Sequence, residues 1–156
     1  MKQVITKLEN DKYFFIASSG NVAYTLDLIS EALRLFSINE LKDAALGKEL
    51  HGCNDFQVDY GDTDENFYIA FYDMLHSKKY EIELNGDKFI DDNQIPKLKF
   101  SHKNFKTILP IWINILKSKP LYILISQDES GWINLKGKEK LSAKEQKLVE
   151  SFQQST

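Results

Sequence analysis

The chain has 156 residues, of which 42% are hydrophobic, 12% aromatic and 28% charged, and its formal net charge is −3. This composition is ordinary for a globular protein, so it excludes extensive disorder, and the length predicts one domain over residues 1–156. Cys53 is the only cysteine, which excludes an internal disulfide.

The cellular compartment is predicted from two kinds of segment, a signal peptide and a membrane-spanning stretch. The first residues, Met1–Glu9, contain no apolar run of the kind that a signal peptide needs. The most apolar stretch, Ile108–Leu116, is too short to span a bilayer and contains Pro110. We therefore expect a cytoplasmic protein that does not bind a membrane.

The first third of the chain predicts one strand and two helices. Residues Tyr13–Ala17 are rich in β-forming side chains, which indicates a buried strand. Apolar residues then recur at spacings of three and four over residues 22–36, a pattern typical of an amphipathic helix. A second short helix is predicted around Glu40 to Leu46. Asn39 would start this helix and Gly47 would stop it.

The middle of the chain predicts a β-meander. Apolar and polar residues alternate with a period of two in the segments Phe56–Tyr60, Phe67–Tyr72 and Tyr80–Leu84. This period is typical of strands that are buried on one face.

A hairpin turn is predicted at Asn85–Gly86, because this dipeptide favours the left-handed backbone of a two-residue turn. Such a turn would place Glu83 opposite Lys88 and Ile82 opposite Phe89. One pair is of opposite charge and the other is apolar, so the register is consistent.

The last third begins with a helix from about His102 to Leu116, with Ser101 as its N-cap. Pro110 should end a first segment of this helix or kink it. One face of the helix is apolar and comprises Phe105, Ile108, Leu109, Trp112, Ile115 and Leu116.

Two strands and a helix complete the chain. Leu121–Ile125 is apolar on both faces and predicts a central strand, and Trp132–Leu135 would return beside it. Ser142 and Glu145 have the spacing of a capping box at the start of a helix. That helix would dock through Leu148, Val149 and Phe152.

The order of these elements predicts the fold class. Strands come in runs and do not alternate strictly with helices, which favours an α+β fold. We expect a mainly antiparallel sheet of about five or six strands packed against three or four helices.

Charge is distributed unevenly along the chain. Residues 1–48 have a net charge of 0, residues 49–96 hold twelve acids and three bases for −9, and residues 97–156 hold five acids and eleven bases for +6. The strongest field is therefore acidic and would attract a basic partner. Nucleic-acid binding is not expected, because it needs a basic field.

The most acidic segment, residues 49–76, contains seven acids and no lysine or arginine. Tyrosines lie within it, and tyrosine beside carboxylates suits an interface because it buries area while keeping a polar tip. Alternatively, the acids only solvate a loop and the tyrosines form a second apolar layer. The predicted partner-binding residues are Asp55, Asp59, Tyr60, Asp62, Asp64, Glu65, Tyr68, Tyr72 and Asp73.

Metal and nucleophile chemistry find little support in the sequence. Asp62, Asp64 and Asn66 match positions one, three and five of a calcium loop, but Phe67 stands where that loop needs glycine. The pair His51–Cys53 lies in an acidic neighbourhood, which opposes a low-pKa thiolate. We expect no metal, no cofactor and no catalytic residue.

The lysine-rich stretch from Lys97 to Lys119 has six lysines and no acid. Phe105 and Trp112 fall on the apolar face of its predicted helix, so we expect them to pack in the core and not to stack on bases. The lysines are interpreted as the solvated face of that helix.

In style, the chain resembles the small immunity proteins that neutralise bacterial toxins, including those of contact-dependent growth-inhibition systems. The resemblance lies in a compact acidic α+β chain, in the carboxylate- and tyrosine-rich segment Asp55–Asp73, and in the turn Gln127–Trp132. It implies a non-enzymatic inhibitor that blocks a basic toxin domain, often a nuclease.

Two other hypotheses remain open. One is a small hydrolase or transferase that uses carboxylates or His51. The other is a structural or regulatory subunit that oligomerises through a sheet edge or the C-terminal helix. The sequence does not determine the oligomeric state.

Overall fold

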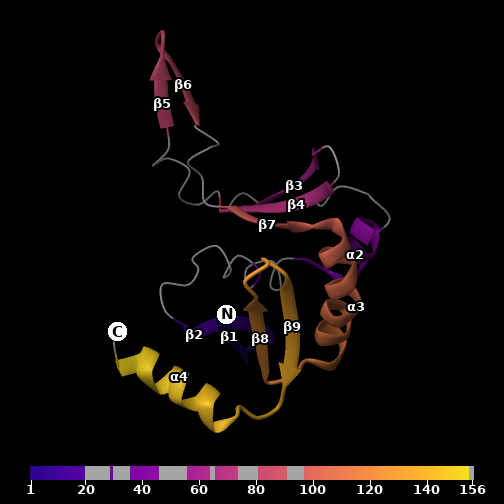
Figure 1. Cartoon of the computed structure of the whole chain (residues 1–156), viewed down its shortest axis with the longest axis vertical. Coiled ribbons are helices and arrows are strands. Elements are labelled where there is room, and N and C mark those ends of the chain that lie inside the picture. The colour runs from indigo at the N-terminus through magenta and orange to yellow at the C-terminus, as the bar shows by residue number, and fades with distance from the viewer. Residues whose placement is uncertain are drawn as a thin grey trace.

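The computed structural model describes residues 1–19, 29, 36–45, 56–63, 66–73, 81–90 and 97–154 (Figure 1). These residues mix helix and strand in an α+β arrangement, as predicted. In chain order the elements are β1 (Lys2–Glu9), β2 (Lys12–Ser18), α2 (Ile38–Ala45), β3 (Phe56–Thr63), β4 (Asn66–Asp73), β5 (Glu81–Leu84), β6 (Asp87–Ile90), β7 (Lys97–Ser101), α3 (His102–Ser118), β8 (Tyr122–Gln127), β9 (Ile133–Lys138) and α4 (Ala143–Gln154).

The largest sheet of the described residues has four strands, fewer than the five or six expected. Its order is β2-β1-β8-β9 and each neighbouring pair is antiparallel. β8 lies between two strands, and Ile123, Leu124 and Ile125 are buried in succession. This confirms the prediction of a central strand that is apolar on both faces.

β1 is a strand that the sequence pattern did not reveal. Val4 and Ile5 are both fully buried and lie on opposite faces of the sheet, where they belong to different hydrophobic clusters. Because both faces are covered, β1 lacks the simple alternation of a half-buried strand. It turns into β2 through Asn10 and Asp11, which both have positive φ angles, as a two-residue hairpin turn requires.

α3 covers one face of this sheet (Figure 1). The predicted apolar face is confirmed, since Phe105, Ile108 and Trp112 are fully buried in the main core cluster. The predicted cap is also confirmed, because the Ser101 hydroxyl accepts a 3.0 Å hydrogen bond from the Asn104 N–H. The helix does not end at Pro110. That residue lies on the solvent side, where water can satisfy the carbonyl that proline leaves without a partner.

Asn104 joins α3 to the outer edge of β9. Its side-chain amide donates to the Ile133 carbonyl at 2.8 Å, and its Oδ1 accepts from the Ile133 N–H at 2.7 Å. Asn104 is 1% exposed. The carboxamide therefore pairs with an edge residue as a neighbouring strand would, and this shields that part of the edge.

α4 packs on the opposite face of the sheet, against β2. The capping box is confirmed, because Ser142 and Glu145 exchange hydrogen bonds of 2.8 and 3.2 Å. Docking is confirmed as well: Leu148, Val149 and Phe152 are partly buried against the second hydrophobic cluster. The Phe152 ring meets the Phe15 ring edge to face, with centroids 5.2 Å apart.

The predicted meander is only partly correct. β3 pairs with β4 as expected, but the next neighbour of β4 is β7, which was not predicted as a strand. β5 and β6 form a separate two-stranded sheet. Their predicted register is confirmed, with Glu83 opposite Lys88 and Ile82 opposite Phe89.

The helix predicted over 22–36 lies outside the described residues except at its buried members Ile29 and Phe36. α2 begins at Ile38 and its cap is Ser37, not Asn39: the Ser37 hydroxyl accepts from the Glu40 N–H at 3.2 Å. Gly47 lies outside the described residues. None of the described helices has the length and apolar character of a membrane span.

Candidate protein-binding surface

The three-stranded sheet β3-β4-β7 carries the described members of the predicted binding site (Figure 1). Asp55, Asp64 and Glu65 lie outside the described residues. The other six occupy two neighbouring strands: Asp59, Tyr60 and Asp62 on β3, and Tyr68, Tyr72 and Asp73 on β4.

The strand register divides these six positions between the two faces of the sheet. Leu98 of β7 pairs with Phe71, which in turn pairs with Val58. Leu98 is 3% exposed and belongs to the main core cluster, so its row marks the face that is turned to the core. By the period of two, the positions on this face include Tyr60, Asp62 and Asp73.

The opposite face gathers the positions of Asp59, Tyr68 and Tyr72. Here the register pairs Tyr72 with Lys97 and Ala70 with Lys99, and Lys99 is exposed. Three of the predicted positions therefore share the face that carries the exposed Lys99, which we call the solvent-side face. Two lysines, remote from the acidic segment in sequence, share it with them.

Charge on this solvent-side face is polarised across the strands. Asp59 pairs with Ala70, and Ala70 pairs with Lys99, so two strand spacings, roughly 9.6 Å, separate the acidic position from the basic one. On this face β3, at one edge, carries the acidic position Asp59, and β7, at the other edge, carries the basic positions Lys97 and Lys99; we call the β3 edge the acidic side of the sheet.

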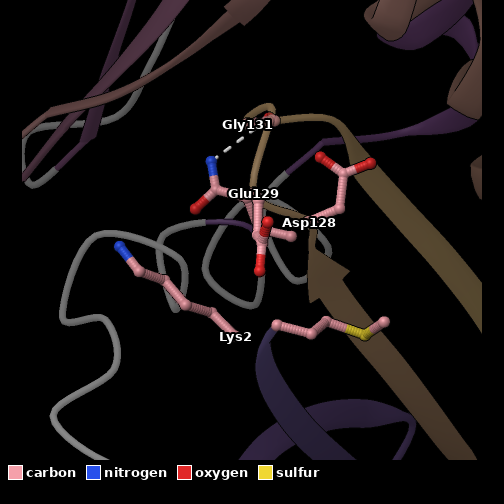
Figure 2. A pocket seen from close by; sticks show the side chains of 6 residues that line it. Lys2, Asp128, Glu129 and Gly131 are labelled. Carbon is pink, nitrogen blue, oxygen red and sulfur yellow. Dashed lines mark hydrogen bonds between the residues drawn. The ribbon is translucent and has the colours of Figure 1, made fainter.

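A second acidic feature is the turn between β8 and β9, which borders a surface pocket of about 300 Å³. Figure 2 shows Lys2, Asp128, Glu129 and Gly131 around this pocket, with the hydrogen bond from the Gln127 side chain to the Gly131 carbonyl, which is 3.2 Å long. The turn belongs to the segment Gln127–Trp132 that carried part of the resemblance.

Hydrogen bonds within this turn hold the Asp128 carboxylate. It accepts from the Ser130 hydroxyl at 2.6 Å, from the Ser130 N–H at 2.9 Å and from the Trp132 N–H at 3.0 Å. These donors, with the Ser130 hydroxyl as the largest cause, lower the pKa of Asp128. The Asp128 carboxylate therefore stays ionised, and its hydrogen bonds stabilise the turn.

Groups suited to other chemistry are dispersed. His51, Cys53 and His76 lie outside the described residues. Burial, and then the neighbouring Lys106, lower the pKa of His102. Within the part of the chain that the structure describes, no three His, Cys, Asp or Glu side chains converge on a metal-sized site.

Residues of the lysine-rich stretch from Lys97 to Lys119 have different roles in the structure. Phe105 and Trp112 are fully buried, which confirms that they pack in the core. Lys119 ends α3 in a left-handed conformation and its ammonium group lies 2.8 Å from the Asp11 carboxylate. Lys103 and Lys106 are exposed on the solvent side of α3, as interpreted from the sequence.

Comparison with protein-family models, with curated proteins and with solved structures finds no match for this chain.

Proposed function

We propose that this protein is a toxin-neutralising immunity protein that binds a basic toxin domain through the acidic side of the β3-β4-β7 sheet. The observation that carries the proposal is the register of this sheet. It gathers Asp59, Tyr68 and Tyr72 on one solvent-side face and leaves the acidic strand β3 at the edge.

The two kinds of residue have complementary roles in such an interface. Carboxylates steer a cationic surface into contact, and close charge pairs across an interface contribute about 1.5–7 kcal/mol each in double-mutant cycles. Tyrosines add buried area at a low entropic cost, because they have few rotatable bonds. The β3–β4 part of this face, with one acidic and two tyrosine positions, therefore suits a lysine- and arginine-rich partner.

The polarity of the sheet predicts how the partner is oriented. The acidic position Asp59 on β3 would attract a basic surface, whereas β7 carries the basic positions Lys97 and Lys99 on the same face. We therefore place the centre of the contact toward β3 and β4. Inhibition in this arrangement needs no chemistry in the immunity protein, since covering the toxin is sufficient.

The test uses a defined partner: the C-terminal domain encoded by the gene immediately upstream of this chain. Co-expression should rescue cells from that domain, and the purified pair should associate quickly, with an association rate that falls as salt is added. The proposal would be refuted if the upstream gene encoded no basic domain, or if co-expression of this protein did not protect cells from that domain.

Two sets of variants locate the contact. We expect Asp59→Asn with Tyr68→Ala and Tyr72→Ala to weaken binding at least tenfold. A second variant replaces Asp62, Asp64 and Glu65 together with neutral residues and tests whether these acids contribute to binding.

A matched control neutralises Glu139 and Glu150, two exposed acids outside this sheet, and should leave binding unchanged. If both binding-site sets bind as the wild type does while rescue persists, the acidic segment is not the site.

A further inference from the structure

The turn Asn85–Gly86 lies outside the hydrophobic core and outside the proposed interface. It is the one Asn-Gly dipeptide of the chain. Both residues are exposed and have positive φ angles, 54° for Asn85 and 84° for Gly86, as the central residues of a two-residue hairpin turn do. A Cβ added at Gly86 would meet nothing within 4 Å, so water has free access to this turn.

The dipeptide places a nucleophile next to an electrophile along the chain. The nucleophile is the backbone nitrogen of Gly86, and the electrophile is Cγ of the Asn85 carboxamide, which this nitrogen attacks to close a succinimide ring. Glycine has no Cβ to hinder the approach. The last pair of the ladder is Leu84 with Asp87, so the Gly86 N–H is not held by strand pairing.

The hairpin that closes this turn has little support from its surroundings. β5 and β6 have four residues each and form a sheet of their own, to which no other described strand pairs. Figure 1 shows this hairpin projecting away from the other labelled elements. Two short strands alone are marginally stable in water, so the hairpin opens at a low cost in free energy. In the open state the Asn85 backbone rotates and brings the Gly86 nitrogen to Cγ.

The turn between β1 and β2 provides an internal comparison. Asn10 and Asp11 are also exposed and also form a two-residue turn, with φ angles of 51° and 66°. Here β1 pairs with β8 as well as with β2, and the Asp11 carboxylate lies 2.8 Å from the Lys119 ammonium group. Asn10 is therefore followed by a residue with a side chain, and its turn is held closed by the four-stranded sheet.

We propose that Asn85 is a site of spontaneous deamidation whose rate is set by opening of the β5–β6 hairpin. Hydroxide removes the proton of the Gly86 N–H and the nitrogen attacks Cγ of Asn85, so that a Cγ–N bond forms and ammonia leaves. Water then opens the succinimide at either carbonyl. Cleavage of the new bond gives aspartate, and cleavage of the original peptide bond gives isoaspartate. The whole sequence consumes one water and releases one ammonia.

The two products affect the hairpin differently. Aspartate keeps the length of the main chain and adds a negative charge close to Asp87. Isoaspartate inserts a methylene group into the main chain of a turn that has only two residues, so Leu84 and Asp87 no longer meet in register. We therefore expect the isoaspartate form of the hairpin to stay open.

Incubation of the folded full chain at mildly alkaline pH, followed by peptide mass spectrometry that distinguishes the two products, tests the proposal. Asn85 should be converted to aspartate and isoaspartate, at a rate within tenfold of its rate in urea, because the hairpin is marginally stable. Asn10 should remain an amide. If Asn85 stays an amide in the folded chain while it reacts in urea, the closed turn protects it and the proposal is overturned.

The variant D11G separates the effect of the dipeptide from that of the fold. It creates a second Asn-Gly pair in the β1–β2 turn, where glycine accepts the positive φ angle. In the folded variant, Asn10 should react at least tenfold more slowly than Asn85, and in urea the two should react at similar rates. Thermal unfolding establishes that D11G is folded. Equal rates in the folded variant would show that hairpin opening has no influence, which would also overturn the proposal.

Nuclear magnetic resonance of the aged chain measures the consequence for the hairpin. Backbone contacts across the pair Glu83–Lys88 should be present in fresh protein and in the variant N85D, and should be lost in the isoaspartate form. The variant N85Q, which lacks the asparagine, should keep them on ageing. Contacts that persist in the isoaspartate form would contradict the expected opening.

Discussion

Replacing Asn104 with alanine is the sharpest test of how the four-stranded sheet is held against α3. The side chain forms hydrogen bonds of 2.8 and 2.7 Å with the carbonyl and N–H of Ile133, and Asn104 is 1% exposed. Asn104→Ala removes both bonds at once and leaves two buried backbone groups of β9 without partners.

The magnitude follows from those two groups. A buried polar group without a partner costs about 1–3 kcal/mol, so two of them cost about 2–6 kcal/mol. Alanine recovers about 0.5 kcal/mol through its higher helix propensity. We expect a net loss of about 3 kcal/mol in the free energy of unfolding, which lowers the melting temperature by about 6–12 °C in a domain of this length.

Urea unfolding followed by circular dichroism measures this loss. Asn114→Ala is the matched control, because Asn114 is exposed on the same helix and should change stability by about 0.5 kcal/mol or less. A loss below about 1 kcal/mol for Asn104→Ala would refute the reasoning, since the two bonds would then contribute no more than surface contacts.

Asn104→Asp adds a pH signature to the same site. The new carboxylate can still accept from the Ile133 N–H, but its second oxygen would face the Ile133 carbonyl. Burial and this repulsion raise the pKa of the new carboxyl in the folded state above its unfolded value. The variant should therefore be least stable, relative to the wild type, at neutral pH. Its free energy of unfolding should approach that of the wild type as pH falls through the raised pKa.

Three further predictions concern packing and pairing elsewhere. Gly137→Ala should destabilise the fold by about 1–3 kcal/mol in urea unfolding, because its Cβ would lie 2.7 Å from Cγ of Pro120; a neutral result would mean that this proline moves freely. Burial acts to raise the pKa of Glu145, but hydrogen bonds from Lys138 and the helix cap outweigh it, so this pKa is lowered. The stability advantage of wild type over Glu145→Gln should accordingly be full at neutral pH and shrink as pH falls through that lowered pKa; an advantage independent of pH would contradict the pairing. Phe152→Ala should cost about 1–2 kcal/mol by thermal unfolding, because it removes an edge-to-face aromatic contact with β2, and an unchanged melting temperature would show that α4 docks without it.

Features fixed by neighbouring residues could be predicted from the sequence. The turn at Asn85–Gly86 specified the hairpin register, and the spacing of Ser142 and Glu145 specified the start of α4. The apolar face of α3 followed from a period that seventeen residues display clearly. Each of these depends on interactions within a few positions of the chain.

Features that depend on distant partners could not. β7 alternates as Lys-Leu-Lys-Phe, which is a strand signal, but its proximity to a helix cap made the lysines look like part of a charged helical face. Its pairing with β4 joins segments that the β5–β6 hairpin separates in sequence. The role of Asn104 was equally hidden, because its partner Ile133 is 29 positions away.

The same long-range pairing changes which acids matter for the proposed function. In sequence, Asp59 and Asp62 belong to one acidic run, but the register assigns Asp59 to the solvent-side face and Asp62 to the face that carries Leu98. A partner that docks on the solvent-side face meets the positions of Asp59, Tyr68 and Tyr72, whereas one that docks on the other face along β3 meets the position of Asp62. The two variant sets therefore identify which side of the sheet the partner uses, a distinction that exists only because β7 fixes the faces.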